Sequence, residues 1–164
     1  MRIIHFAPEP QLSVELRKRA SEYRTADLNM NCDLRLDIET LDLPDASVDV
    51  FVLNQVLEHI DDRRALAELH RCLTPGGTAA LTMPVIEGWG QTYENEAVAR
   101  SSHSRLRSLH FGWPDHLRYY GADVRHRIQE AGFELTEFCA TGEQTARHGL
   151  LPGERIFLAR KPVD

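Results

Sequence analysis

The sequence has few cysteines, no long apolar run and no surplus of basic residues, and each absence excludes a class of protein. Cys32, Cys72 and Cys139 form no C-x-x-C pair, which argues against a zinc knuckle and fits a reducing compartment. No segment is long and apolar enough to cross a bilayer, and residues 1–8 lack the sections of a signal peptide. The formal net charge of −6 argues against general nucleic-acid binding. We therefore expect a soluble, cytoplasmic protein that binds neither nucleic acid nor membranes.

A strand, a helix and a second strand are predicted between residues 48 and 83. The run from Val48 to Leu53 is short, rich in β-branched residues and nearly all apolar, as in a parallel strand covered on both faces. A helix should begin near Asp61 and end before the T-P-G-G sequence at 74–77. Its apolar residues recur at helical spacing: Ala65, Leu66, Leu69, Cys72 and Leu73. Such a βαβ unit implies an α/β sheet.

The rest of the chain continues this alternation within a single domain of residues 1–164. Further strands are predicted at residues 3–6, 23–28, 34–38, 133–140 and 155–160, and helices at about 11–20 and 123–131. Residues 29–33 are too few to hold the helix that a complete doubly wound unit places there. We therefore expect a shortened sheet that has lost one helix.

A long connection between about residues 85 and 121 is rich in aromatic and polar residues. A connection of this length inside a small domain is typical of a functional lid. Its end overlaps a basic segment, residues 100–127, which also contains His103, His110, His116 and His126. This segment is either a basic lid over an anionic substrate or a solvated helix face.

Ligands in open α/β sheets bind beyond the carboxyl ends of the strands. Candidate ligand-binding residues therefore follow the first four strands: Ala7, Pro8, Glu9, Asp27, Asp37, Ile38, Asn54 and Gln55. Three of them are carboxylates, which accept hydrogen bonds from ammonium, hydroxyl and amine groups. The rival interpretation is that aspartates at strand ends merely cap turns.

Residues 43–77 contain LPDASVDVFVLNQVLEHI followed by AELHRCLTPGG. This segment resembles the central part of class I S-adenosylmethionine-dependent methyltransferases, whose pattern is LPF-x-x-x-SFD-x-V, LEH and E-x-x-R-x-L-x-PGG. The resemblance extends over about residues 3–138. It implies a Rossmann-like, doubly wound, mostly parallel α/β sheet with an antiparallel last strand, and S-adenosyl-L-methionine as cofactor.

The resemblance also implies roles for residues at the strand ends. Asp27 matches the acidic residue that binds the ribose hydroxyls. Asp37 and Ile38 match the pair that contacts adenine, and Asn54 and Gln55 match the positions that flank the methionine end of the cofactor.

The chain departs from this family after its first strand. The usual D-x-G-x-G-x-G loop is replaced by HFAPEPQ at residues 5–11, which contains no glycine. A subgroup with H-x-APE at this place resembles the present chain, and it shares the pattern F-G-x-x-DH-x-R-x-YG found at residues 111–121. Glu9 could take the place of the missing acidic residue and bind the cofactor's ammonium, or it could simply favour the positive end of the following helix.

Methyl transfer from a sulfonium chiefly requires alignment of the acceptor and exclusion of water. An oxygen or nitrogen acceptor of a small molecule, such as a sugar or a biosynthetic intermediate, would gain from a histidine base. The catalytic candidates are His59, His110 and His116; His59 could instead be structural. Tyr93, Arg118 and Tyr119 are the candidate substrate-binding residues, or else they anchor the lid to the sheet.

Two other functions remain open at the level of sequence. A non-catalytic methyltransferase-like module that binds a protein partner would explain the missing glycines and the missing helix. A nicotinamide-binding protein fits less well, since G-x-G-x-x-G is absent.

The spacing of His103, His110 and His126 matches no metal-ligand pattern, so no metal is predicted. Family relatives cover the first strand with preceding helices, and its exposure here makes a homodimer an expectation.

Overall fold

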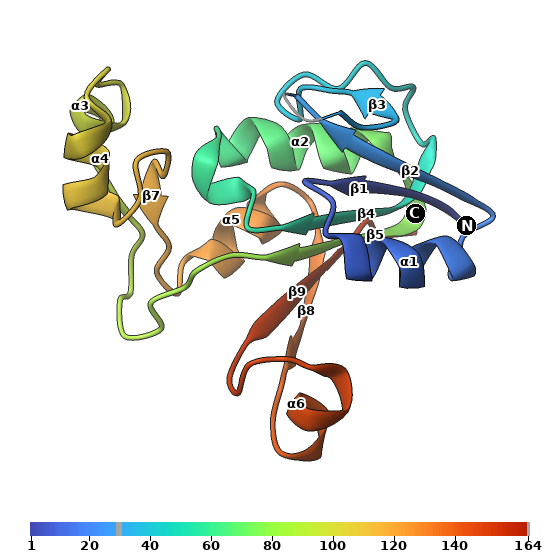
Figure 1. The fold of residues 1–164 in the computed structure, drawn as a ribbon. Coiled ribbons are helices and arrows are strands. Elements are labelled where there is room, and N and C mark those ends of the chain that lie inside the picture. The colour runs from blue at the N-terminus through green and yellow to red at the C-terminus, as the bar shows by residue number, and fades with distance from the viewer. Residues whose placement is uncertain (29–30, 164) are drawn as a thin grey trace.

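The computed structural model describes residues 1–28 and 31–163, and within them the chain forms a seven-stranded sheet with helices on both faces (Figure 1). The strand order is β3-β2-β1-β4-β5-β9-β8. The strands are β1 (Arg2–Phe6), β2 (Glu22–Asp27), β3 (Leu34–Arg35), β4 (Val48–Asn54), β5 (Leu73–Thr82), β8 (Glu134–Cys139) and β9 (Arg155–Arg160).

The direction of the strands confirms the predicted fold class. The pairs from β3 to β5 are all parallel, whereas β9 runs antiparallel to both of its neighbours, β5 and β8. The sheet is therefore mostly parallel, and its antiparallel strand is the last in the sequence. This is the Rossmann-like, doubly wound architecture that the βαβ pattern indicated.

Two helices cover opposite faces of the sheet because alternate strand residues point to opposite sides (Figure 1). On one face, Ile4 and Phe6 belong to the main core, to which α2 (Asp62–Cys72) contributes its buried apolar stripe. On the other face, Ile3 forms a smaller core with Tyr23 and Val52, covered by partly buried residues of α1 (Pro10–Arg19). The predicted periodicity of both helices is thus confirmed.

Several predicted boundaries were wrong in detail. The third strand spans only Leu34–Arg35, shorter than the predicted 34–38. Helix α2 ends at Cys72, before the T-P-G-G sequence as predicted, but β5 begins at once with Leu73 and runs through that sequence. A short helix, α6 (Glu143–His148), lies between the last two predicted strands, where no helix was predicted. No helix lies between β2 and β3 among the described residues; Asn29 and Met30 of the predicted connection fall outside them.

Residues 85–121, which we call the cap, hold small elements rather than a bare loop. They are β6 (Tyr93–Glu94), α3 (Glu96–Ala99), α4 (Ser104–Phe111) and β7 (Arg118–Tyr119), and β6 pairs with β7. Helix α5 (Val124–Glu130) then leads into β8. The cap rests on the 3-10 turn η1 (Leu57–His59) that follows β4, where the Leu117 backbone N–H donates to the Glu58 carbonyl at 2.8 Å.

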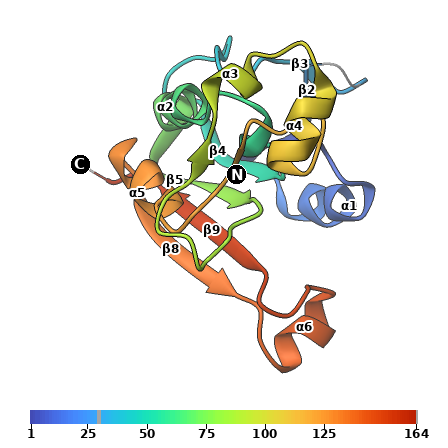
Figure 2. The ribbon, with the colours of Figure 1, turned by 90° about the vertical axis from the view of Figure 1, so that its left-hand side faces the viewer.

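Strands β8 and β9 extend away from the body of the molecule and carry α6 at their far end (Figure 2). In both views this arm lies away from α3 and α4 of the cap. Within the described residues, no helix has the length and apolar character needed to span a membrane.

Candidate functional site

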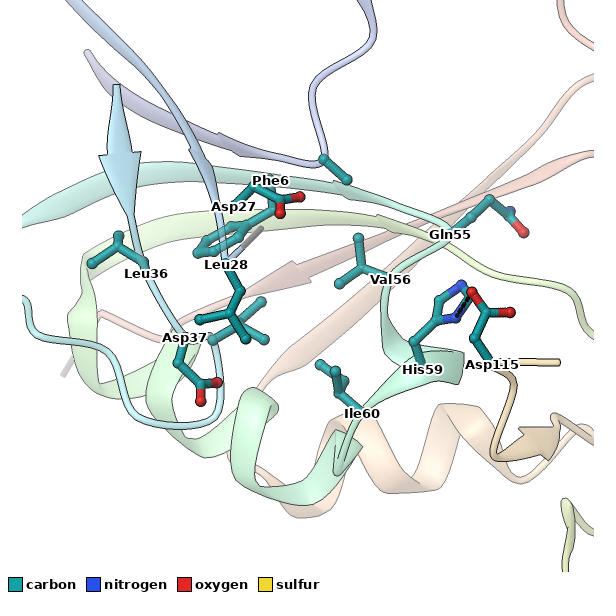
Figure 3. Close-up of a pocket in the computed structure, with 12 residues that line it drawn as sticks. Phe6, Asp27, Leu28, Leu36, Asp37, Gln55, Val56, His59, Ile60 and Asp115 are labelled. Atoms are coloured by element: carbon teal, nitrogen blue, oxygen red, sulfur yellow. Dashed lines mark ion pairs between the residues drawn. The ribbon is translucent and has the colours of Figure 1, made fainter. Parts of the chain in front are cut away.

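A cavity of about 520 Å³ opens at the carboxyl edge of the sheet, between β1, β2, β4 and the cap (Figure 3). Its volume falls in the range of roughly 300–1,000 Å³ that small-molecule sites occupy. It is lined by Phe6, Ala7, Asp27, Leu28, Leu36, Asp37, Ile38, Gln55, Val56, His59, Ile60 and Asp115. Apolar side chains form its floor, and three carboxylates and one imidazole are its ionisable groups.

The strand register explains why residues distant in sequence meet here. Phe6 of β1 pairs with Ala26 of β2 and with Leu53 of β4, so these three parallel strands end at one level. The next residues along the chain therefore share one edge. We call Ala7, Asp27, Asp37 and Gln55 the rim of the sheet.

Two rim residues have a backbone conformation that usually requires glycine. Ala7 has φ of 46° and Gln55 has φ of 53°, both in the left-handed region. Residues with a side chain are strained there, by about 1–3 kcal/mol at sites that the fold over-determines. The loop after β1 thus contains no glycine, yet Ala7 supplies a left-handed turn at the edge of the cavity.

Both predicted rim aspartates line the cavity. Asp37 is exposed, and one of its carboxylate oxygens accepts a hydrogen bond from the Glu39 backbone N–H at 2.9 Å. The same side chain therefore caps a turn and faces the cavity. Capping a turn and binding a ligand, the two roles considered from the sequence, are compatible for Asp37. The neighbouring Ile38 is buried and provides an apolar surface beside Asp37.

Three other predicted cofactor residues lie outside the cavity lining. The Glu9 carboxylate lies 2.9 Å from Nε2 of the fully buried His5, whose Nδ1 is 2.9 Å from the Tyr23 hydroxyl. Burial lowers the pKa of His5, and the Glu9 charge opposes that shift. The H-x-APE sequence therefore closes the turn after β1 on itself. Pro8 is not among the lining residues, and the side-chain amide oxygen of Asn54 accepts a hydrogen bond from the Thr82 hydroxyl at 3.2 Å.

The predicted substrate residues are engaged within the cap. The Tyr93 hydroxyl lies 2.6 Å from Nδ1 of His110, and Tyr119 pairs with Tyr93 across the small sheet. None of these three lines the cavity, so the structure does not bring His110 to the predicted site.

Arg118 is buried and anchors the cap to the sheet. Its guanidinium donates to the carbonyls of Leu57 and Ile60 at 2.9 and 2.6 Å, and to Glu94 at 2.7 Å. The Tyr120 hydroxyl beside it donates to Asp62 at 3.0 Å. Arg118 is 8% exposed and anchors the cap in this structure, and its role in substrate binding stays a prediction.

At the cap end of the cavity, two histidines meet. The ring centroids of His59 and His116 are 4.7 Å apart, edge to face, and Oδ2 of Asp115 lies 3.4 Å from Nδ1 of His59 (Figure 3). His59 lines the cavity, as predicted for a catalytic candidate, whereas His116 is buried behind it. Burial and the neighbouring His59 lower the pKa of His116.

Glu58, not singled out by sequence analysis, is buried beside these histidines. Its side chain is 1% exposed, and burial raises its pKa to about 7. Asp115 was likewise missed as a cavity residue. Its place in the cavity could not be predicted, because a contact between η1 and the cap depends on the tertiary fold and leaves no periodic signal in the sequence.

Comparison with known proteins places this fold in a class. A structure of an S-adenosylmethionine-dependent methyltransferase from Mesorhizobium loti superposes over 98% of this chain and 90% of its own, with a TM-score of 0.65 and 16% identity. An N1-methyltransferase from Burkholderia thailandensis, solved with 1,6-didemethyltoxoflavin and S-adenosylhomocysteine, gives a TM-score of 0.62 at 15% identity, covering 98% of this chain and 71% of that one. The fold is that of class I methyltransferases.

Sequence comparison adds a similarity over part of the chain. Residues 8–81 match the model of the methyltransferase domain. An uncharacterised methyltransferase of Mycobacterium tuberculosis is 40% identical over 67 residues, which cover 40% of this chain and 32% of the relative. Residues 8–81 are therefore similar to the methyltransferase domain family. The alignment spans about a third of the length of the curated relatives that it matches.

Proposed function

We propose that this chain binds S-adenosyl-L-methionine at the rim of the sheet and transfers its methyl group to an oxygen or nitrogen of a small molecule. The observation that carries the proposal is the cavity at the carboxyl ends of β1, β2 and β4, with Asp27 and Asp37 on its wall. This is where open α/β sheets bind their ligands. The S-adenosylmethionine-dependent methyltransferases whose fold this chain shares use this cofactor.

The lining residues fit the chemical groups of that cofactor. The carboxylates of Asp27 and Asp37 are acceptors for ribose hydroxyls and an adenine amine. Leu36, Ile38 and Ile60 offer an apolar surface for a planar ring. The left-handed turn at Ala7 would provide the close backbone approach that glycine gives in the methyltransferases that this chain resembles.

When bound, the cofactor supplies a methyl group on a positively charged sulfur, which is already an activated leaving group. The protein then has to align an acceptor and exclude water. His59 and Asp115 mark the acceptor end of the cavity, because they lie at the cap side, away from Asp37 (Figure 3). Polar groups at this end suit an acceptor that carries oxygen or nitrogen.

A non-catalytic module that binds a protein partner was the alternative. An open cavity of about 520 Å³ with paired aspartates favours a small ligand instead. The decisive experiment is isothermal titration of the purified chain with S-adenosylmethionine and with S-adenosylhomocysteine, with NADH as a control for general nucleotide binding. We expect saturable binding of the first two only. No binding of either, or equal binding of NADH, would contradict the proposal.

A further inference from the structure

Glu58, His59 and His116 form a compact group of ligand atoms at the cap end of the cavity. One carboxylate oxygen and one ring nitrogen from each histidine all lie within 4.8 Å of one another. Two imidazoles and one carboxylate are the ligand set of many divalent transition-metal sites, with the remaining coordination position left open.

The polar atoms of this group lack partners. Among the described residues, neither carboxylate oxygen of Glu58 nor Nδ1 of His116 has a hydrogen-bond partner, although all three atoms are buried. Glu58 is 1% exposed and His116 is 7% exposed. A buried acceptor without a donor costs about 1–3 kcal/mol, and more if it is charged. Three such atoms gathered together form a site that a positively charged group would satisfy.

We propose that Glu58, His59 and His116 bind one divalent transition-metal ion, of the zinc class. Metal bonds of about 2.0–2.2 Å place tetrahedral ligands about 3.4 Å apart, so the ligand atoms, which lie within 4.8 Å of one another, need to close by up to about 1.4 Å. The cation would neutralise the Glu58 carboxylate and give the histidine nitrogens a partner.

Neighbouring groups support this assignment. Asp115 lies 3.4 Å from Nδ1 of His59, the kind of carboxylate contact that orients a metal-binding imidazole. Arg118 is the nearby cation that opposes metal binding, but its charge is already balanced by Glu94 at 2.7 Å and Asp62 at 3.8 Å. The Glu58 carboxylate is therefore left to neutralise the metal.

His59 lines the cavity, so the open coordination position of the ion faces the acceptor end. An oxygen donor on the acceptor molecule, a hydroxyl or a carboxylate, would bind there and be polarised. This second step rests on the proposed methyl transfer, whereas metal binding itself does not.

The first test is calorimetric titration of the metal-free chain with Zn²⁺, without any cofactor. We expect one Zn²⁺ per chain. The variants Glu58→Gln, His59→Ala and His116→Ala should each bind at least about 100-fold more weakly, since each removes a ligand, and Asp115→Asn about tenfold more weakly, since it removes an orienting neighbour. His126→Ala is the matched control, because His126 and Glu130 form an exposed pair on α5 that lies 3.1 Å apart and could bind zinc adventitiously.

Two results would overturn the proposal: no zinc binding by the wild-type chain, or binding that is lost in His126→Ala and kept in Glu58→Gln. The second would mean that Glu58 is a neutral buried acid and that the zinc sits on the helix surface.

Since buried variants can fail to fold, X-ray absorption of the zinc-loaded wild-type chain provides a check without mutation. Two imidazoles per zinc are expected, and none or one would contradict the site. Titration with S-adenosylhomocysteine in the same samples separates this outcome from failure of the proposed function.

Discussion

The rim and the cap contribute to the same cavity, yet different forces hold them in place. Rim residues extend from parallel strands whose positions are fixed by the register of an apolar sheet. The cap has few buried apolar residues, among them Val98 and Phe111, and it is tied to η1 by a buried ionic network around Arg118. A polar substitution at the rim should therefore change ligand binding alone, whereas one in the cap network should change stability first.

The largest expected effect is on the cap side. Arg118→Ala removes a buried cation from beside Asp62 and Glu94, and it removes a donor from the carbonyls of Leu57 and Ile60. Breaking a buried ion pair in this way costs about 3–5 kcal/mol in the free energy of unfolding. Urea denaturation measures the loss. Arg100→Ala is the control, since Arg100 is exposed and pairs with Glu96 on the surface; it should cost less than about 1 kcal/mol. Equal losses in the two variants would show that the network does not hold the cap.

A smaller change tests the same network more finely. Tyr120→Phe removes a hydroxyl whose single proton can be donated to Asp62 at 3.0 Å or to the Leu57 carbonyl at 3.1 Å, while keeping the buried ring. We expect a loss of about 1–2 kcal/mol, the usual effect of removing a buried hydrogen bond. The affinity for the cofactor should stay unchanged, because Tyr120 does not line the cavity. A drop in affinity without loss of stability would mean that Tyr120 contributes to ligand binding and does not hold the cap in place.

Asp49 lies at the start of β4, at the edge of the sheet opposite the cavity, and its effect on stability should depend on pH without affecting ligand binding. Hydrogen bonds from Arg2 lower the pKa of Asp49 from 3.8 to about 2. This contribution to stability is present above pH 3.8 and is lost as the pH falls toward 2. The side chain is 31% exposed, so we expect only about 1 kcal/mol. Asp49→Asn should therefore reduce the fall in stability between neutral pH and pH 2, measured by thermal melts, with no effect on ligand binding. A variant that loses stability as steeply as wild type would contradict this assignment.

The smallest effects concern the rim backbone. Ala7 and Ala46 both have positive φ, but only Ala7 lines the cavity. Replacing either by glycine should raise the stability by up to about 1 kcal/mol, because glycine adopts this conformation without strain. Only Ala7→Gly should also alter the affinity for S-adenosylhomocysteine. If both variants leave that affinity unchanged, the turn at Ala7 has no part in binding.

The two regions also differ in how far the sequence predicts them. Strand ends follow from hydrophobic patterning, so Ala7, Asp27, Asp37 and Gln55 could be placed at one edge before the structure was known. Residues of the cap could not, since their positions depend on contacts between segments far apart in sequence.

Glu58, Asp115 and Arg118 illustrate the difference. Glu58 lies in the LEH motif, and Asp115 and Arg118 lie in the motif of residues 111–121. The role of each residue nevertheless depends on the packing of η1 against the cap. The pairing of Glu9 with His5 was missed for the same reason. Residue type alone does not reveal which charged groups have found partners inside the protein.

The central claim is that the rim of the sheet binds the cofactor through its carboxylates. The most direct test is calorimetric titration of S-adenosylmethionine into wild type, Asp37→Asn, Asp37→Ala and the control Asp42→Ala, in which an exposed carboxylate outside the cavity is removed. We predict that both Asp37 variants lose about 1–3 kcal/mol of binding free energy, as expected for a charge-assisted hydrogen bond, and that Asp42→Ala binds as wild type does. Unchanged affinity in Asp37→Asn and Asp37→Ala would contradict the account.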